Sequence, residues 1–340
     1  MPTRRAPAGY KPDLPAGCTQ RFYRAGDEHG ILELLEEAFK GSWPGRAISV
    51  PGIEHLRWKL HSGPLAARLH LVAELDRRII GARPMWVDRV KVGERVVLTR
   101  LAIDRAVAPE FQRMRVMTAM EARTPDEWFS LFDILVGVVN DWQSISFVPG
   151  TPYRRKLDVV GRTLDGNLPD VVANGWSVKR VDLFDERIDG LWSEASPGLQ
   201  LAMLRTKERL NYRYADPRAG DYRIATAEQG ERVLGYVVYT SWQGTGQIAD
   251  MLVRPDRLDV LESLLGNALC DLQTTGATSA ECWRDLHHPY GTVLERLGFI
   301  ELRRRQRMSL HALHGSDDAV SFFADPKSVV HITSGDTDLV

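Results

Sequence analysis

The stretch AVAPEFQRMRVMTAM, residues 106–120, decides how this chain folds. An apolar strand that begins near Leu98 runs to Pro109, and a helical pattern follows over residues 112–123. Proline cannot donate to a strand ladder, but it suits the first turn of a helix. The pattern therefore predicts a strand, a tight turn and a helix in immediate succession.

The same landmarks recur further along the chain. GQIADMLVRPD (246–256) follows LTRLAIDRAVAPE (98–110) in placing an aspartate, Asp250 or Asp104, three residues before a valine and five before a proline. Upstream of each, residues 69–87 and 221–240 predict two apolar strands joined by a short charged turn, which is typical of a hairpin. The shared order predicts one α/β unit present twice. Two α/β segments that resemble each other by chance are the alternative.

The expected fold class is α/β (α+β), with two tandem units, each a mixed, mostly antiparallel twisted sheet flanked by helices. Residues 1–15 are basic and rich in proline, and we expect them to form a flexible leader. The stretch 161–175 is rich in Gly, Asn and Asp, which is typical of a joint between units. The expected units are therefore residues 16–170 and 171–340.

Composition limits the classes of function. Hydrophobic residues make up 44% of the chain, charged residues 26%, and the formal net charge is −1. This balance is typical of a globular protein and gives no field that would recruit nucleic acid or an anionic membrane. No apolar run approaches the roughly 20 residues that cross a bilayer, and no apolar segment marks a signal peptide. The three cysteines have neither metal-ligand spacing nor disulfide density. We expect a cytoplasmic protein without nucleic-acid or membrane partners, and a homodimer stays open.

The order of helix, antiparallel strands, a strand ending in V-x-P, a helix, a strand and a helix resembles the GNAT (Gcn5-related N-acetyltransferase) family. In that family the strand ends in V-x-P-E-[YF], and a loop of pattern [QR]-x-x-G-x-[GA] opens the helix. The matching residues here are Val107, Pro109, Glu110, Phe111 and Gln112. Arg115 and Met117 stand where the family has small residues.

The resemblance implies that acetyl-CoA or another acyl-CoA is a co-substrate, with its pyrophosphate held by loop N–H groups and the helix dipole. The cofactor-binding residues expected on this basis are Val107, Gln112, Arg113, Met114, Arg115, Val116, Met117 and Asn140. Glycine lets backbone approach phosphate closely, so Arg115 and Met117 depart from what the loop needs. Arg113 and Arg115 supply compensating charge in one interpretation, and in the other they lie on a solvated helix start and bind nothing.

The resemblance also implies direct attack of an amine on a thioester, without a covalent enzyme intermediate. Asp104 is the first candidate for the base and Glu110 the second. A backbone N–H on the strand ending at Val107 would hold the oxyanion, and Tyr153 lies near the position of the tyrosine that protonates the departing thiolate in the family. The structural alternatives are that Asp104 pairs with Arg100 or Arg105, that Glu110 is a first-turn acid, and that Tyr153 is a half-buried aromatic residue.

The second unit differs at its loop. RPDRLDVLES (254–263) has no glycine and carries three acids, so we predict that it does not bind CoA in this manner. The first unit is therefore the expected catalytic unit and the second a supporting one. His287 and His288 are expected in a loop, with no metal site. The run 303–307 is expected on a solvated strand edge, and the acidic end 334–340 as a flap over a cleft.

The predicted function is an acyl-CoA-dependent N-acyltransferase acting on a small-molecule amine or an amino sugar. A relative of the FemABX peptidyl transferases, which take aminoacyl-tRNA, is one alternative, and the lack of basic excess counts against it. A non-catalytic GNAT-like binding module is the other, supported by the missing glycines.

Overall fold

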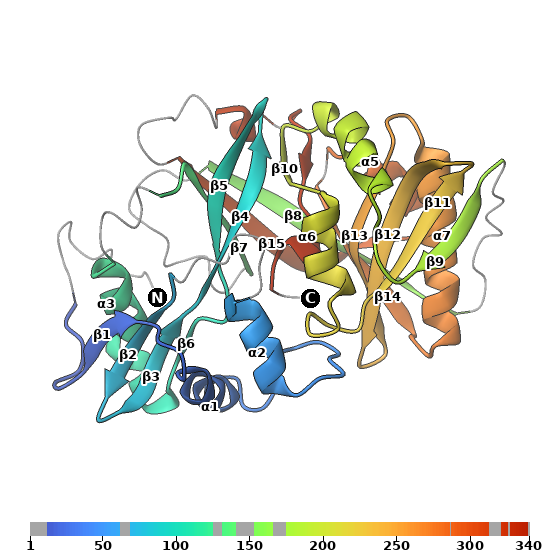
Figure 1. The fold of residues 1–340 in the computed structure, drawn as a ribbon. Coiled ribbons are helices and arrows are strands. Elements are labelled where there is room, and N and C mark those ends of the chain that lie inside the picture. Colours follow the sequence, from blue (N-terminus) through green and yellow to red (C-terminus); the bar gives the residue numbers. More distant parts are fainter. Residues whose placement is uncertain are drawn as a thin grey trace.

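The computed structural model describes residues 12–61, 69–124, 131–140, 153–165, 175–285, 287–312, 321–325 and 327–338. Helices and strands follow one another in the order that Figure 1 shows. The elements of the first half are β1 (Thr19–Phe22), α1 (Glu28–Ala38), α2 (Gly52–His61), β2 (Leu71–Leu75), β3 (Arg78–Arg83), β4 (Met85–Val92), β5 (Arg95–Ala102), β6 (Ala106–Val107), the 3-10 turn η1 (Pro109–Met114), α3 (Val116–Ala122), β7 (Ile134–Asn140) and β8 (Tyr153–Thr163).

The second half repeats the succession of strands and helices. Its elements are β9 (Ser177–Val181), α5 (Arg187–Ala195), η2 (Ser196–Gly198), β10 (Leu201–Met203), α6 (Lys207–Leu210), the π-turn η3 (Asn211–Ala215), β11 (Arg223–Gln229), β12 (Arg232–Trp242), β13 (Thr245–Val253), α7 (Leu258–Thr274), β14 (Ser279–Arg284), α8 (Tyr290–Arg296), β15 (Ile300–Ala312), η4 (Ser321–Ala324), β16 (Val330–His331) and η5 (Ser334–Asp336). The predicted mixed α/β class is confirmed.

Both predicted hairpins are present. Strands β2 and β3 pair antiparallel, and the turn between them has positive φ at Asp76 (49°) and Arg77 (64°). Positive φ at both central residues lets a two-residue turn follow the twist of the strands. Strands β11 and β12 pair in the same way around Gly230, whose φ is 58°.

A glycine faces the valine that ends the proline-terminated strand in each half. Gly81 pairs with Val107, and Gly235 pairs with Val253. A Cβ at Gly81 would lie 3.1 Å from the Met120 sulfur, and one at Gly235 would lie 2.5 Å from a methyl carbon of Val253. Any other residue at these two positions would push apart elements that pack closely at the strand end.

The strand and helix predicted around Pro109 are each interrupted. Residues 98–110 form β5 and β6, with Asp104 at φ 39° between them. The helix predicted from residue 112 is instead η1, then Arg115 at φ 58°, then α3 from Val116. Both predictions were wrong in their boundaries, because a left-handed residue breaks the regular hydrogen-bond ladder at each point.

The two halves share one large sheet. Its order is β16-β10-β4-β5-β7-β15-β8-β14-β13-β12-β11-β9, and a smaller sheet has the order β1-β2-β3-β6. In the middle, β15 of the second half pairs with β7 and β8 of the first, and β8 pairs with β14. The expectation of a strand edge at residues 303–307 was therefore wrong for the end of this run, because Gln306 and Arg307 pair with both β7 and β8. The side chains of this run lie outside the described residues.

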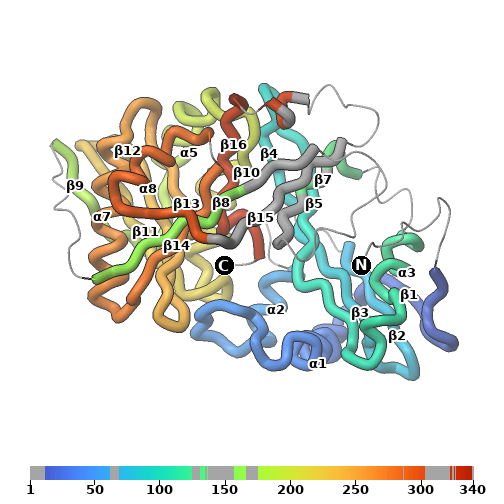
Figure 2. The backbone as a smooth tube through the Cα atoms, turned by 180° about the vertical axis from the view of Figure 1, so that it is seen from behind, coloured from blue at the N-terminus to red at the C-terminus, as the bar shows by residue number. Residues whose placement is uncertain are grey.

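Figure 1 and Figure 2, which view the molecule from opposite sides, both place the C-terminus between the two halves. Helices cover the sheets through apolar faces: α1 buries Ile31, Leu34 and Leu35, and the buried face of α7 packs against strands of the second half. Within the part of the chain that the structure describes, no helix is long and apolar enough to span a membrane.

Candidate active site at the end of β6

The strand that ends at Val107 diverges from its parallel neighbour β7. Parallel strands β5 and β7 pair only at Thr99–Ile134 and Arg100–Leu135. Beyond this contact the chain continues into β6, which belongs to the smaller sheet, whereas β7 stays in the larger one. The strands that begin as neighbours therefore separate at the position where the sequence resemblance places the acyl group.

The backbone N–H of Val107 points away from β3. In an antiparallel ladder, successive residues direct their N–H groups alternately toward and away from the partner strand. The Ala108 N–H donates to the Ile80 carbonyl over 2.9 Å, so the Val107 N–H has the opposite direction. This is the orientation that an oxyanion donor on this strand needs.

The loop after Val107 keeps the backbone shape that glycine favours, although it has no glycine. Arg115, at the family's first glycine position, has φ 58° and ψ 25°. A non-glycine residue in this left-handed region is strained, so the geometry is held against the preference of the residue. Residues 112–115 are exposed, Val116 is buried and Met117 is half-buried. The Gln112 side chain donates to the Val107 carbonyl over 3.3 Å.

Asp104 belongs to a buried cluster whose members are far apart in the sequence. The Lys59 ammonium lies 2.6 Å from its carboxylate, and the Asp104 N–H donates to the Asp338 carboxylate over 2.8 Å. The ammonium also lies 5.9 Å from the centre of the Trp43 ring and 6.0 Å from that of Trp86. Asp104 thus has Lys59 as its ion-pair partner. Arg105, one of the partners considered from the sequence, pairs with Glu121 instead.

Burial shifts the protonation of this cluster. Burial lowers the pKa of Lys59, and the negative charge of Asp104 acts in the opposite direction. It raises the pKa of Asp338, and Lys59 opposes this shift while the negative charge of Asp104 adds to it. These shifts bring the pKa values of Lys59 and Asp338 closer together, which favours proton exchange at this cluster.

Three arginines spaced four residues apart hold the C-terminal segment, residues 333–338, in place. Arg205 and Arg209 donate to the two carboxylate oxygens of Asp336 over 2.6 and 2.9 Å. Arg213 donates to the carbonyls of Gly335 and Thr337 over 2.9 and 3.0 Å. Residues 334–337 of the segment predicted as a flap are therefore buried between the halves, and Asp338 next to them lies against Asp104; residues 339 and 340 lie outside the described residues.

The remaining predicted site residues lie elsewhere. Glu110 is exposed and lies 2.5 Å from Arg78. Its own backbone N–H and Arg78 lower its pKa. The backbone of Asn140 pairs with Gln306, and that of Tyr153 pairs with Leu310, so both flank β15. The side chains of Asn140 and Tyr153 lie outside the described residues.

Several charged residues of this region were missed in the sequence. Lys59 and Asp338 had no motif, although a lysine between buried Trp58 and Leu60 on one short helix is itself a signal of a buried charge. Arg83 and Arg100 are also buried, and desolvation lowers their pKa values to about 10 and about 9. An anion brought near them would favour their charged forms.

The second half closes the equivalent strand end. The Arg254 N–H donates to the Leu234 carbonyl over 2.9 Å, so the Val253 N–H points away from β12. There it donates to the Tyr290 hydroxyl over 2.9 Å. His288 follows in a turn, as predicted, and its ring lies 3.0 Å from His331 of the C-terminal strand β16. In the second unit, the N–H that corresponds to that of Val107 is thus bonded within the chain itself.

Comparison with known proteins identifies the fold. No protein-family model matches the sequence, and no curated protein matches it. Among solved structures, Saccharomyces cerevisiae N-myristoyltransferase with bound myristoyl-CoA is similar over 89% of this chain and 80% of its own, with a TM-score of 0.63 at 13% identity.

Two bacterial proteins are similar as well. A probable N-acyltransferase of unknown function from Enterococcus faecalis has a TM-score of 0.60 at 13% identity, over 85% of this chain and 72% of its own. A GCN5-related N-acetyltransferase from Anabaena variabilis has a TM-score of 0.61 at 12% identity, over 86% and 72%. These likenesses show that the chain has a GNAT-like fold over most of its length, as the resemblance predicted.

Proposed function

We propose that this protein is an acyl-CoA-dependent N-acyltransferase that works in its first unit, residues 16–170, with the second unit, residues 171–340, as its support. The observation that carries the proposal is the contrast between the two strand ends. The Val107 N–H points away from β3 at the strand end that diverges from β7, whereas Tyr290 accepts the N–H of Val253. The bound myristoyl-CoA of the yeast neighbour supports an acyl-CoA as co-substrate.

The acyl-CoA would lie with its phosphates at residues 112–117 and its thioester carbonyl at the Val107 N–H. The acceptor is an amine of a small molecule or an amino sugar. Its nitrogen attacks the thioester carbon, the carbon–sulfur bond breaks, and the CoA sulfur leaves as a thiol after protonation. Asp104 is the proposed proton acceptor, because it lies three residues before Val107 in the buried cluster with Lys59, whereas Glu110 is exposed.

The first test is direct. The purified protein is titrated with acyl-CoAs from acetyl to myristoyl, and free thiol release is measured with a library of amines. We expect binding of at least one acyl-CoA and thiol release that depends on the amine. Absence of binding across the series would overturn the proposal.

A pair of variants then tests the strand end. Val107→Pro removes the N–H without removing a bond to β3, and Val107→Ala keeps the N–H while shortening the side chain. Loss of one oxyanion donor typically lowers kcat about 10²- to 10³-fold, so we expect that loss in the proline variant and a change of only about a few fold in the alanine variant. Circular dichroism checks that both fold. Equal loss of kcat in two folded variants would show that this N–H is not used.

A further inference from the structure

A half-buried tyrosine lies between two buried arginines next to the C-terminal segment. The hydroxyl oxygen of Tyr222 accepts from Arg213 over 2.8 Å and from Arg46 over 3.2 Å. Arg213 is 2% exposed and Arg46 is 5% exposed. Arg46 comes from the chain before α2, Arg213 from η3 and Tyr222 from the residue before β11, so the cluster joins the two halves.

The Tyr222 oxygen is surrounded by donors. A guanidinium group donates hydrogen bonds but cannot accept one, so neither arginine can take the hydroxyl proton. Among the described residues, no hydrogen-bond acceptor lies at this hydroxyl. An ionised oxygen would accept both bonds, and hydrogen bonds to an ionised group are roughly twice as strong as neutral ones. Arginine keeps its proton in proteins, so Tyr222 is the member of this group that can lose one.

Two other tyrosines of the second unit have the opposite surroundings. The ring centre of Tyr214 lies 5.2 Å from that of Tyr222, yet its hydroxyl donates to the Asp250 carboxylate over 3.1 Å. The Tyr239 hydroxyl donates to the Asp271 carboxylate over 3.0 Å. Burial and the neighbouring carboxylate raise the pKa of both tyrosines. A carboxylate acceptor thus favours the protonated phenol at these two positions.

The charges around Tyr222 act in the other direction. Burial raises the pKa of Tyr222, but the positive charges of Arg213 and Arg46 outweigh it and lower the pKa below the ordinary 10.0. The charged and titratable groups around the phenol are Arg213 and Tyr214 from η3, Arg46 from the chain before α2 and, beyond Arg46, Asp338 and Asp104.

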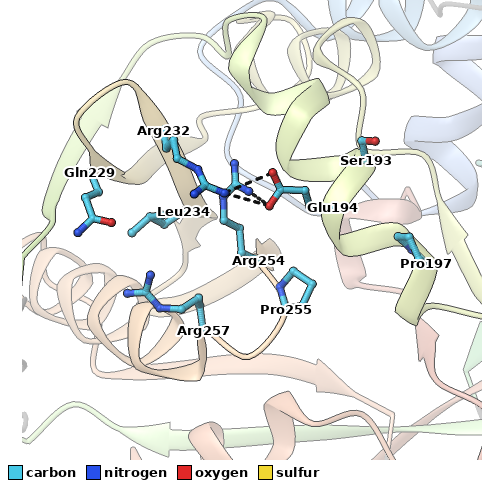
Figure 3. A pocket seen from close by; sticks show the side chains of 9 residues that line it. All are labelled: Ser193, Glu194, Pro197, Gln229, Arg232, Leu234, Arg254, Pro255 and Arg257. Atoms are coloured by element: carbon cyan, nitrogen blue, oxygen red, sulfur yellow. Dashed lines mark hydrogen bonds and ion pairs between the residues drawn. The ribbon is translucent and has the colours of Figure 1, made fainter.

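A carboxylate fills the equivalent place between two other arginines of the second unit. Figure 3 shows an open pocket of about 500 Å³ beside α5, where Glu194 accepts from Arg232 over 3.3 Å and is also paired with Arg254. One anionic oxygen group is thus shared by two guanidinium groups. At Tyr222, a phenol oxygen has the position that the carboxylate has in that pocket.

Both arginines of the Tyr222 cluster hold the C-terminal segment. Arg46 donates to the carbonyl of Asp338, and Arg213 donates to two further carbonyls of the segment. The Asp338 carboxylate in turn accepts the N–H of Asp104. The orientation of the two guanidinium groups therefore affects where Asp338 meets Asp104.

We propose that Tyr222 is a positioning residue, whose phenolate is the shared counter-ion of Arg46 and Arg213 and so fixes the C-terminal segment against Asp104. The catalytic part of this inference rests on the proposed function, in which Asp104 accepts the proton. The ionisation of Tyr222 and the fixing of the segment do not rest on it.

The ionisation is measured by absorbance. The near-ultraviolet absorbance of phenolate is followed while the folded full chain is titrated from neutral pH to pH 10.0, with circular dichroism as the check on folding. We expect one of the nine tyrosines to ionise before the others. This early step should be absent in Tyr222→Phe and present in the matched control Tyr239→Phe. Arg46→Gln keeps the phenol but removes one donor, so it should move the step toward pH 10.0.

Two results of this titration would overturn the proposal. One is a folded wild type in which no tyrosine ionises early, a result that needs no variant. The other is an early step that persists in Tyr222→Phe.

Hydrogen exchange measures how firmly the C-terminal segment is held. Amide exchange of residues 333–338 is followed by mass spectrometry at one pH for the wild type and both phenylalanine variants. Tyr222→Phe removes a charge-assisted acceptor, so we expect exchange about tenfold faster or more. Tyr239→Phe should leave it unchanged. Equal exchange in the wild type and Tyr222→Phe, or equal acceleration in both variants, would show that Tyr222 does not fix the segment.

Kinetics test the catalytic part. Where the wild type releases thiol with an amine, Tyr222→Phe should lower kcat about tenfold with an unchanged KM for the acyl-CoA, and Tyr239→Phe should change neither. An unchanged kcat in Tyr222→Phe would overturn the positioning of Asp104. A wild type that releases no thiol would instead contradict the proposed function, while absorbance and hydrogen exchange still decide whether Tyr222 ionises and fixes the segment.

Discussion

At the scale of single residues, the stability of the first unit depends on the buried pair of Lys59 and Asp104. The Lys59 side chain is 0% exposed and that of Asp104 is 9% exposed. Removing one member of a buried ion pair leaves the other charge desolvated, which typically costs about 3–5 kcal/mol. We therefore expect Lys59→Met to lower the free energy of unfolding by about 3 kcal/mol, measured by urea denaturation near neutral pH.

The double variant Lys59→Met with Asp104→Asn provides the control. It leaves Asp338 as the one carboxylate of this cluster instead of two, so it should regain part of the lost stability. Strictly additive effects of the two substitutions would contradict a direct coupling between these side chains.

Tyr290 gives a second expectation at this scale. Its hydroxyl accepts the Val253 N–H over 2.9 Å in the core of the second unit. Tyr290→Phe leaves that buried N–H without its acceptor, so we expect a loss of about 1–2 kcal/mol in the free energy of unfolding. If the second unit only supports the first, the variant keeps its acyl transfer rate. A large fall in kcat with unchanged stability would instead make Tyr290 a catalytic residue.

At the scale of elements, α1 depends on Glu28 at its first turn. Burial raises the pKa of Glu28, but hydrogen bonds from the Tyr23 hydroxyl and the Gly26 N–H outweigh it and lower the pKa to about 2. The ordinary value is 4.5. A carboxyl whose pKa is depressed on folding stabilises the protein above its unfolded pKa, and this stabilisation is lost as the pH falls from 4.5 toward 2.

We therefore expect the wild type to be more stable than Glu28→Gln at pH 7, and the difference to shrink between pH 4.5 and 2. Urea denaturation at several pH values measures it. Glu36, on the exposed face of the same helix, gives the control Glu36→Gln. A difference between wild type and Glu28→Gln that stays constant with pH would show that Glu28 contributes through packing alone.

Sequence reasoning reached the order of these elements because hairpins, glycines and prolines act locally. Gly81 and Gly235, for example, lie in the second strands of the two predicted hairpins, opposite matching valines. Sequence reasoning missed the breaks at Asp104 and Arg115. Neither residue type at these positions marks a left-handed backbone conformation in the sequence.

The candidate site was less accessible from the sequence than the fold. Asp104 and the loop around Arg115 were found through a motif. Lys59 and Asp338 were not, since each meets Asp104 only through tertiary structure. Which distant residues form a buried ion pair is decided by the fold, and the spacing of residues in the sequence does not show it.

At the scale of the whole molecule, the two similar halves are joined by strands that pair across them. Strand β15 of the second half lies between β7 and β8 of the first, and β8 lies between β15 and β14. The C-terminal segment adds a second connection, because Arg205 and Arg209 hold its Asp336 while Asp338 reaches Asp104. Two units that resemble each other in sequence are thus joined by strands that each contributes to the other.

This arrangement predicts that the halves do not fold separately. Expressed alone, residues 1–170 would present β7 and β8 without the strand that pairs with both, and residues 171–340 would leave β14 and β15 without β8. Unpaired N–H and C=O groups in the centre of a sheet are costly and promote aggregation. We expect each fragment to be unfolded or aggregated, and the two to co-purify in equal amounts when they are produced together. Size-exclusion chromatography and circular dichroism measure both outcomes. A monomeric fragment 1–170 with its own cooperative unfolding transition would contradict this expectation, since it would show that the first sheet closes without β15.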